Sequence, residues 1–228
     1  MQDRTTEWFV PKFGSRNFRV GVGILFLPYT CIVTCFAAWG SLGGEFSAER
    51  LVAISVIYFL SVGVSAHCLD AVGGKTKPWG NLPKKKIMII ALSVLAVAFF
   101  IGIYYALESP LLIPIGIAEG FFLFAYNLEL FGGRFHNNFF TVISWGILPV
   151  FAGSVIQTNS ISGVTLILSC VSAAITYLLI TTSRKYKRLK IDKVDSKEIK
   201  SKELVLKFIS LGVVSVTIFF VILRIYLS

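Results

Sequence analysis

Charged residues are scarce in this chain of 228 residues. Only 15% of the residues are Asp, Glu, Lys or Arg, against roughly 25% in an average soluble domain. Hydrophobic residues make up 55%, and the mean hydropathy is +0.77. The apolar residues fall in blocks of about 20, the length that a helix needs to cross the roughly 30 Å hydrocarbon layer of a bilayer. This composition excludes an ordinary soluble domain and predicts an all-α polytopic membrane bundle, one integral membrane domain over residues 1–228.

Several familiar site motifs are also missing. The sequence contains no nucleotide-binding loop, no GxSxG, no HExxH and no internal repeat. Its four cysteines all lie within or at the ends of apolar runs, and Cys31 and Cys35 lie one turn apart on one helix face. That placement suits neither a disulfide across loops nor a tetrahedral zinc site. We interpret the cysteines as small apolar packing residues.

Hydropathy predicts seven membrane spans. They cover residues 20–43, 50–72, 87–107, 111–131, 139–157, 161–182 and 205–226. If the N-terminus lies inside, every Lys and Arg except Arg50 and Arg224 lies in or beside an inside segment. Enrichment of cytoplasmic loops in Lys and Arg sets membrane orientation. The sequence therefore predicts a multi-pass protein of the cell membrane with a cytoplasmic N-terminus and an outside C-terminus.

The net charge of +10 follows from this topology. Basic inside loops are attracted to anionic lipid headgroups, so we expect no nucleic-acid partner. We expect residues 1–18 to form a short amphipathic segment that lies at the membrane interface before the first span and is anchored there by Trp8. Residues 184–204 predict a basic cytoplasmic loop, either a short surface helix or a mobile segment, whose charges are solvated.

The second predicted span ends in an ionisable pair. His67 and Asp70 are three residues apart, so both point to roughly one side of a helix. A basic loop with Lys75 and Lys77 follows directly. Ionisable groups this close to a membrane indicate a functional site. The alternative is a His–Asp hydrogen bond that caps a helix end near the headgroups.

The fourth predicted span carries a second polar group. Glu119 lies near its middle, where a carboxyl group must be protonated, partnered or lining a polar cavity. Structural and functional roles are equally consistent with its position. Tyr126, Asn127 and Glu129 lie at the inside end of the span, and Tyr126 shares a helix face with Glu119.

The loop after this span, residues 131–138, adds Arg134 and His136 beside a Gly pair that lets the backbone approach a ligand closely. Carboxylates at helix ends can hold Mg²⁺, which usually bridges one or two carboxylates and substrate phosphates. Lys and Arg bind phosphate oxygens directly, and the apolar spans can accept a lipid tail. Together with the basic run of residues 184–204, these inside loops predict a site for an amphiphile with a phosphate or diphosphate head at the cytoplasmic face.

Two stretches resemble a known family. Residues 66–70 close the second span, the basic, Pro-containing segment 75–78 follows before the third, and residues 146–153 read G-x-L-P-x-x-x-G after Tyr126. In these stretches and in its N-in start the chain is similar to the UbiA superfamily of intramembrane prenyltransferases, whose first motif is NxxxDxxxD. Position 74 is Gly, and residues 183–187 read Ser-Arg-Lys-Tyr-Lys where the second aspartate motif of the family lies.

The resemblance implies prenyl transfer to a lipid or aromatic acceptor. In the family, two Mg²⁺ ions held by both motifs offset the charge of the diphosphate and help it to leave, which produces an allylic carbocation. Here the resemblance implies metal binding by Asp70 and Glu129, and catalytic roles for Asp70, His67 and Tyr126. The expected substrate-binding residues are Lys75, Lys77, Asn127, Arg134 and His136.

Three interpretations remain open from the sequence. The first is a prenyltransferase that uses Mg²⁺ and a prenyl diphosphate. The second is a non-catalytic membrane protein of the same fold that binds a lipid or quinone, or serves as a subunit among other membrane subunits. The third is a transporter or another activity.

Overall fold

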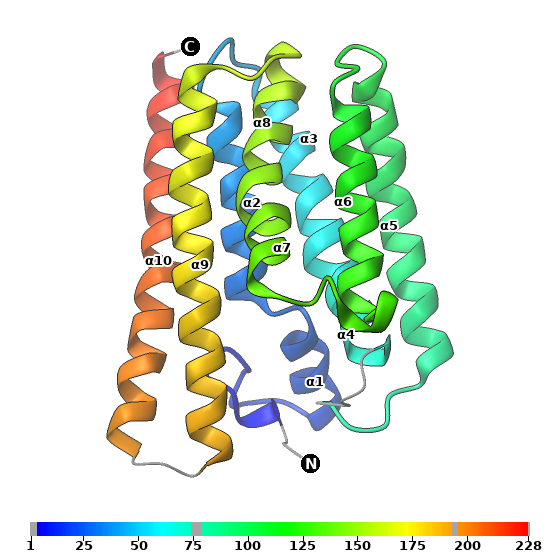
Figure 1. The fold of residues 1–228 in the computed structure, drawn as a ribbon, viewed down its shortest axis with the longest axis vertical. Helices are drawn as coiled ribbons and strands as arrows, with labels where there is room; N and C mark the ends of the chain where they lie inside the picture. Colours follow the sequence, from blue (N-terminus) through cyan, green and yellow to red (C-terminus); the bar gives the residue numbers. More distant parts are fainter. Residues whose placement is uncertain (1–3, 74–78, 193–195, 228) are drawn as a thin grey trace.

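A computed structural model describes residues 4–73, 79–192 and 196–227, and all regular structure in these ranges is helical (Figure 1). The α-helices are α1 (Arg16–Ile24), α2 (Leu27–Ser41), α3 (Ala48–Tyr58), α4 (Ala66–Gly73), α5 (Lys84–Ala106), α6 (Leu112–Asn127), α7 (Asn138–Val142), α8 (Leu148–Thr158), α9 (Gly163–Ile191) and α10 (Ser196–Leu227). The shorter elements are the 3₁₀ turns η1 (Arg4–Thr6) and η3 (Phe131–Gly133) and the π-helical segments η2 (Phe59–Ser65) and η4 (Ile143–Ile147). The prediction of an all-α fold is confirmed for the described residues.

Six helical passes in the described ranges are long and apolar enough to cross a membrane. They are Arg16–Ser41, Ala48–Gly73, Lys84–Ala106, Asn138–Thr158, Gly163–Ile191 and Ser196–Leu227. The prediction of a multi-pass membrane protein is therefore supported. The expected fourth span, residues 111–131, is the shorter helix α6 of 16 residues. The segment that begins at Arg4 and the end of α10 lie at opposite ends of the bundle (Figure 1).

Helix α2 is the centre of the bundle and packs against α8, α3 and α10. Two glycines allow α2 and α8 to approach closely. A Cβ atom on Gly40 would collide with the carbonyl oxygen of Val150, and one on Gly153 would collide with that of Ala37. Small residues commonly permit such close packing between membrane helices. Gly153 lies in the predicted fifth span and Gly40 in the predicted first span, so these two spans pack closely.

The helices at the periphery present apolar side chains outward. Only 11% of the most apolar stretch of α5 and 22% of that of α10 is buried. Exposed residues include Phe100 on α5 and Phe219 on α10. The hydrocarbon layer contains no water, so apolar side chains can face lipid tails there. The backbone N–H and C=O groups are hydrogen-bonded within the helix itself.

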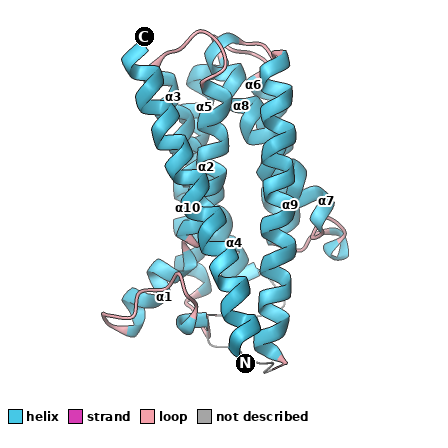
Figure 2. Cartoon of the chain, turned by 90° about the vertical axis from the view of Figure 1, so that its left-hand side faces the viewer, coloured by secondary structure: helices cyan, strands magenta, loops and turns pink. Residues whose placement is uncertain are grey.

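The basic segment 184–204 differs from its prediction as a separate loop. Helix α9 continues to Ile191, and α10 begins at Ser196. At 1.5 Å per residue, the 29 residues of α9 span about 43 Å, more than a bilayer core needs. Figures 1 and 2 show both helices projecting past the others at the end where the chain begins. The basic residues of α9 are thus fixed on a helix surface.

The N-terminal segment also differs from its prediction as an amphipathic segment at the membrane interface. Val10 is buried in the core cluster, and Trp8 and Phe9 pack against that cluster. The segment lies across the end of the bundle beside α9 (Figure 1). It is an integral part of the fold rather than a surface anchor.

Candidate functional site

A cavity of about 210 Å³ lies at the end of the bundle where the chain begins. It is lined by residues of the N-terminal segment, α2, α4, α6, α7, η4, α9 and the loop after α6. The lining residues are Arg4, Phe26, Tyr29, His67, Asp70, Tyr126, Asn127, Glu129, His136, Thr141, Trp145, Ile180, Ser183, Arg184 and Lys187. This volume is below the roughly 300–1,000 Å³ of pockets that enclose a drug-sized ligand. It suits the head of an amphiphile.

Three irregularities in the helices surround this cavity. Phe26 has left-handed backbone angles between α1 and α2, and Pro28 lies in the first turn of α2. The π-helical segment η2 directly precedes α4, which carries His67, and η4 contains Trp145. Kinks and π-helical turns interrupt regular side-chain spacing and occur often at functional sites. Each of the three breaks adjoins or contains a residue of the cavity wall.

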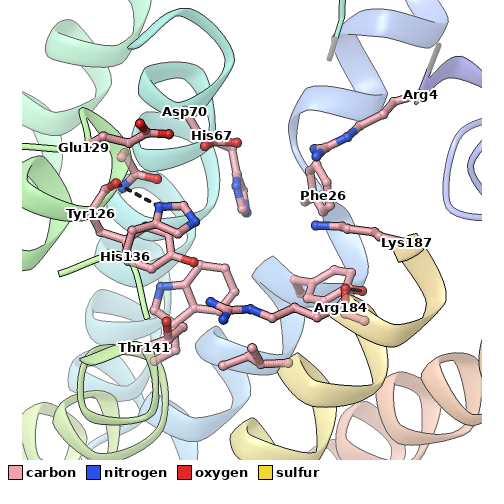
Figure 3. Close-up of a pocket in the computed structure, with 15 residues that line it drawn as sticks. Arg4, Phe26, His67, Asp70, Tyr126, Glu129, His136, Thr141, Arg184 and Lys187 are labelled. Atoms are coloured by element: carbon pink, nitrogen blue, oxygen red, sulfur yellow. Dashed lines mark hydrogen bonds between the residues drawn. The ribbon is translucent and has the colours of Figure 1, made fainter. Parts of the chain in front are cut away.

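The acidic and aromatic wall combines α4 with the end of α6. Asp70 comes from α4, and Tyr126 and Asn127 come from the last turn of α6. Asn127 is buried, and its Nδ2 donates to the carbonyl oxygen of Leu123 at 2.7 Å. In Figure 3, Asp70, Glu129 and Tyr126 lie on the same side of the cavity. The carboxylates predicted to act together are therefore neighbours in one wall.

An unusual loop holds Glu129 and His136 in this wall. Glu129 and Phe131 have positive φ angles of 50° and 55°, and Gly132 and Gly133 follow with φ of 70° and 78°. Positive φ is uncommon for residues other than glycine and clusters at functional sites. The loop folds His136 back onto Tyr126, with ring centroids 4.1 Å apart, and places its Nδ1 3.3 Å from the Tyr126 carbonyl oxygen.

His67 is held by aromatic contacts rather than by Asp70. Its ring stacks on Phe26 with centroids 5.1 Å apart and meets Trp145 edge-on at 6.0 Å. The side chain is only 8% exposed, and its Nε2 has no hydrogen-bond partner in the described ranges. No hydrogen bond joins His67 to Asp70, so the structure does not support the helix-capping alternative. Buried polar atoms are rarely left unpaired, and this one lies in the wall of the cavity.

The opposite wall is cationic. Arg184 and Lys187 come from α9, and Arg4 comes from η1. Figure 3 shows Arg4 and Lys187 near Phe26, and Arg184 extending across the cavity toward the aromatic wall. The Arg4 Cζ and Lys187 Nζ atoms lie 5.6 and 6.0 Å from the Phe26 ring centroid. None of the three cations forms an ion pair with another described residue.

Glu7 holds the segment that presents Arg4. Its buried carboxylate accepts hydrogen bonds from Lys190 Nζ at 2.9 Å and from the Tyr186 hydroxyl at 3.0 Å. On the other side, Arg19 Nη2 donates to the Thr5 carbonyl oxygen at 2.7 Å. These contacts tie the start of the chain to α9 and α1. The position of Arg4 is therefore fixed by the fold.

Most of the residues predicted from the sequence meet at this cavity. The predicted residues among its lining are His67, Asp70, Tyr126, Asn127, Glu129 and His136. Arg134 is exposed and does not line the cavity. Lys75 and Lys77 lie outside the described residues.

The sequence indicates the basic run after the sixth span only as a whole and does not single out the residues of the cationic wall. Arg184 and Lys187 fall in the segment predicted as a basic loop, although they continue the helical spacing of Ile180 and Ser183, which also line the cavity. That spacing was the available signal. Arg4 gave no comparable signal, because its place depends on tertiary contacts of the N-terminal segment.

A second cavity of about 20 Å³ lies behind the first and shares Tyr126, Asn127 and Trp145 with it. Glu119 lines this smaller cavity and accepts a hydrogen bond from the Tyr58 hydroxyl at 2.9 Å. No ion pair to Glu119 occurs among the described residues. The group is thus partnered by a neutral hydroxyl, which satisfies one of the conditions expected for a carboxyl in mid-membrane.

The donor atoms around the larger cavity do not fit the pair of Mg²⁺ ions that the family resemblance implies. Within the described ranges, no group of three or more His, Cys, Asp and Glu side chains could hold a metal ion. Asp70 and Glu129 are the carboxylates of the lining, and they face Arg4, Arg184 and Lys187. Arg184 and Lys187 stand where the second aspartate motif is expected. A two-metal centre needs more oxygen ligands and fewer nearby cations.

The arrangement can bind an anion between cationic and aromatic groups. Arg presents a planar fork of donors that matches phosphate, and Lys adds a mobile point charge. The aromatic rings of the cavity give the first carbons of a ligand an apolar surface. Comparison of the chain with protein-family models, with curated proteins and with solved structures gave no match in any of the three.

Proposed function

We propose that this chain is a UbiA-like membrane protein that binds a lipid with a phosphate or diphosphate head, such as a prenyl diphosphate, at the predicted cytoplasmic face. The observation that carries the proposal is the cavity wall of Arg4, Arg184 and Lys187, none of which forms an ion pair with a described residue. Charges held at the membrane without a partner are costly and mark ligand sites.

The dimensions of the cavity support a ligand with an apolar tail. About 210 Å³ holds a headgroup and a few carbon atoms, so the remainder of the ligand must lie along the apolar helices. Phe26, Trp145 and Ile180 line the cavity beside the charged groups. A polar head next to apolar walls inside a lipid-exposed bundle fits an amphiphile better than a soluble metabolite.

Prenyl transfer is the second candidate, and the rings around the cavity favour it. Aromatic faces stabilise a cation that lies over them, and Phe26, Tyr126 and Trp145 line the same space. In such a transfer the allylic C–O bond breaks, and its electron pair leaves with the diphosphate. An electron-rich acceptor forms the new C–C or C–O bond and loses a proton to a nearby base such as His67 or Asp70. Without an acceptor, the same site acts as a lipid- or quinone-binding component of a membrane complex.

The proposal is tested with purified protein in phosphatidylcholine nanodiscs. Binding of labelled geranylgeranyl diphosphate is measured with excess Mg²⁺, against geranylgeraniol, which has the same tail without the head. We expect saturable binding of the diphosphate and weak binding of the alcohol. Equal binding of the two, or no binding of either, would refute a phosphate-headed ligand.

Transfer is measured in the same preparation with added lipid and aromatic acceptors. Release of diphosphate together with a prenylated product would establish the enzyme. Binding without release would assign the non-catalytic role. Asp70→Asn is the control for transfer, since it keeps the shape of the side chain and removes its charge.

A further inference from the structure

We infer that the cationic wall contacts the phosphate oxygens directly, so that this chain holds its ligand without Mg²⁺. The inference rests on the proposed function and concerns how the head is recognised. It assigns headgroup binding to Arg4, Arg184 and Lys187, none of which is among the substrate-binding residues predicted from the sequence.

The first observation is that two basic residues of α9 lie on the same face of the helix and line the cavity. Arg184 and Lys187 are three apart on one helix, so they share a face, and both line the cavity. Lys185 and Arg188, their neighbours on α9, are exposed, and Lys185 lies 3.6 Å from Glu198 in an ion pair. Lys190 pairs with Glu7. The other basic residues named here therefore divide into an exposed pair, Lys185 and Arg188, and a pair that lines the cavity, Arg184 and Lys187.

A second element completes the wall. Arg4 approaches from the N-terminal segment and is fixed there by the contacts of Glu7 with α9. Three cations from two elements thus converge on one cavity, against the two carboxylates of Asp70 and Glu129 in the facing wall. The lining therefore carries an excess of positive charge that an anionic head can offset.

The cavity wall also contains a buried polar atom without a hydrogen-bond partner in the described ranges. His67 Nε2 lies in the wall without a hydrogen bond, on a side chain that is 8% exposed. A ligand oxygen within the cavity would satisfy it. Of the five buried side-chain atoms that lack a partner in the described ranges, His67 Nε2 is the one whose residue lines the cavity, and this observation is independent of the charges.

A metal ion on the phosphate would work against this geometry. Arg184 and Lys187 occupy the position where the family resemblance implies carboxylates for a second ion. A divalent cation placed there would be repelled by both side chains in a region of low dielectric. Direct contact uses the same cations to hold the phosphate through charge-assisted hydrogen bonds.

The experiment measures affinity for geranylgeranyl diphosphate in phosphatidylcholine nanodiscs, in EDTA and in excess Mg²⁺. Variants Arg184→Gln and Lys187→Gln test the wall, and Arg188→Gln is the matched control one turn further along α9. Inorganic pyrophosphate and phosphatidic acid, added separately, distinguish a soluble anion and a bulk lipid headgroup from a prenyl diphosphate. Melting temperature reports the folding of each variant.

We expect unchanged affinity in EDTA, and a loss of about 10- to 100-fold for each wall variant, the range for a hydrogen bond to a charged group. Arg188→Gln should bind as the wild type does. Binding in Mg²⁺ that disappears in EDTA would overturn the inference and leave the proposed function standing. Failure of every phosphate-headed probe in both conditions would instead overturn the proposed function. Wall variants that melt normally and bind normally in EDTA would also contradict direct contact.

Discussion

The charged groups that line the cavity differ from Arg50 at the opposite end of the bundle. At the end away from the cavity, Arg50 pairs with Glu108 and donates to the carbonyl oxygen of Ile156 at 2.6 Å. Gln157 there accepts from the backbone N–H of Ser47 at 2.8 Å and donates to its carbonyl oxygen at 3.1 Å. At the cavity end, three cations lack ion-pair partners among the described residues, and His67 Nε2 has no hydrogen bond.

Under the proposed function, this difference separates a group that stabilises the fold from groups that bind a ligand. A paired group contributes to stability, and losing its partner leaves a buried polar atom unsatisfied. An unpaired cation near the membrane destabilises the protein until an anion arrives. Substitutions at the two ends should therefore have opposite profiles, with stability changing at one end and binding at the other.

The largest expected effect is on binding at the cavity end. The double variant Arg184→Gln/Lys187→Gln should weaken binding of geranylgeranyl diphosphate by at least about 100-fold, because two charged hydrogen-bond donors are lost. Its melting temperature without ligand should stay the same or rise, since two unpaired cations are removed. Equilibrium binding and thermal unfolding in nanodiscs measure both quantities. A fall in melting temperature with intact binding would show that Arg184 and Lys187 stabilise the fold and do not bind the ligand.

The next effect is on stability at the opposite end. Arg50→Gln removes the bonds to Glu108 and to the end of α8, and should lower the free energy of unfolding by about 1–3 kcal/mol. Binding of the diphosphate by the folded fraction should be unchanged. Chemical unfolding in mixed micelles measures the first quantity, and a titration measures the second. Weakened binding by folded protein would show that the two ends are coupled.

A smaller effect is expected at His67. His67→Phe keeps an aromatic ring against Phe26 and Trp145 but removes the unpartnered nitrogen. Affinity should fall by about tenfold, the value of one lost hydrogen bond to a charged group, while stability should not decrease. A loss of folded protein in this variant would mean that the imidazole serves the fold.

The smallest effect is expected at Glu119. Glu119→Gln should be tolerated, because the amide oxygen can accept the same hydrogen bond from the Tyr58 hydroxyl. Hydrogen bonds between membrane helices average only about 0.6 kcal/mol, so a modest change in geometry costs little. Yield and melting temperature of the variant check this. Severe loss of folded protein would instead indicate a buried ionic partnership.

The sequence predicted the membrane-helical class because long apolar blocks are a local property of the chain. It also placed Asp70, Tyr126 and Glu129 at one site, since all three follow from helix ends on one predicted side of the membrane. It indicated the basic run only as a whole and could not single out Arg184 and Lys187, because the continuation of α9 that brings them to the cavity was predicted as a loop. The place of Arg4 could not be predicted from the sequence. It depends on the ion pair between Glu7 and Lys190, two residues that lie far apart along the chain.

The most direct test is whether the charged head of a ligand stabilises the wild-type protein beyond what the same tail does without the head. A ligand that binds only the folded state stabilises it by about 2.7 kcal/mol at 100 times its dissociation constant. The melting temperature in neutral nanodiscs is measured with geranylgeranyl diphosphate and with geranylgeraniol at equal concentrations. The account predicts a clear rise with the diphosphate and little or none with the alcohol. An equal rise with both, or no rise with either, would contradict it.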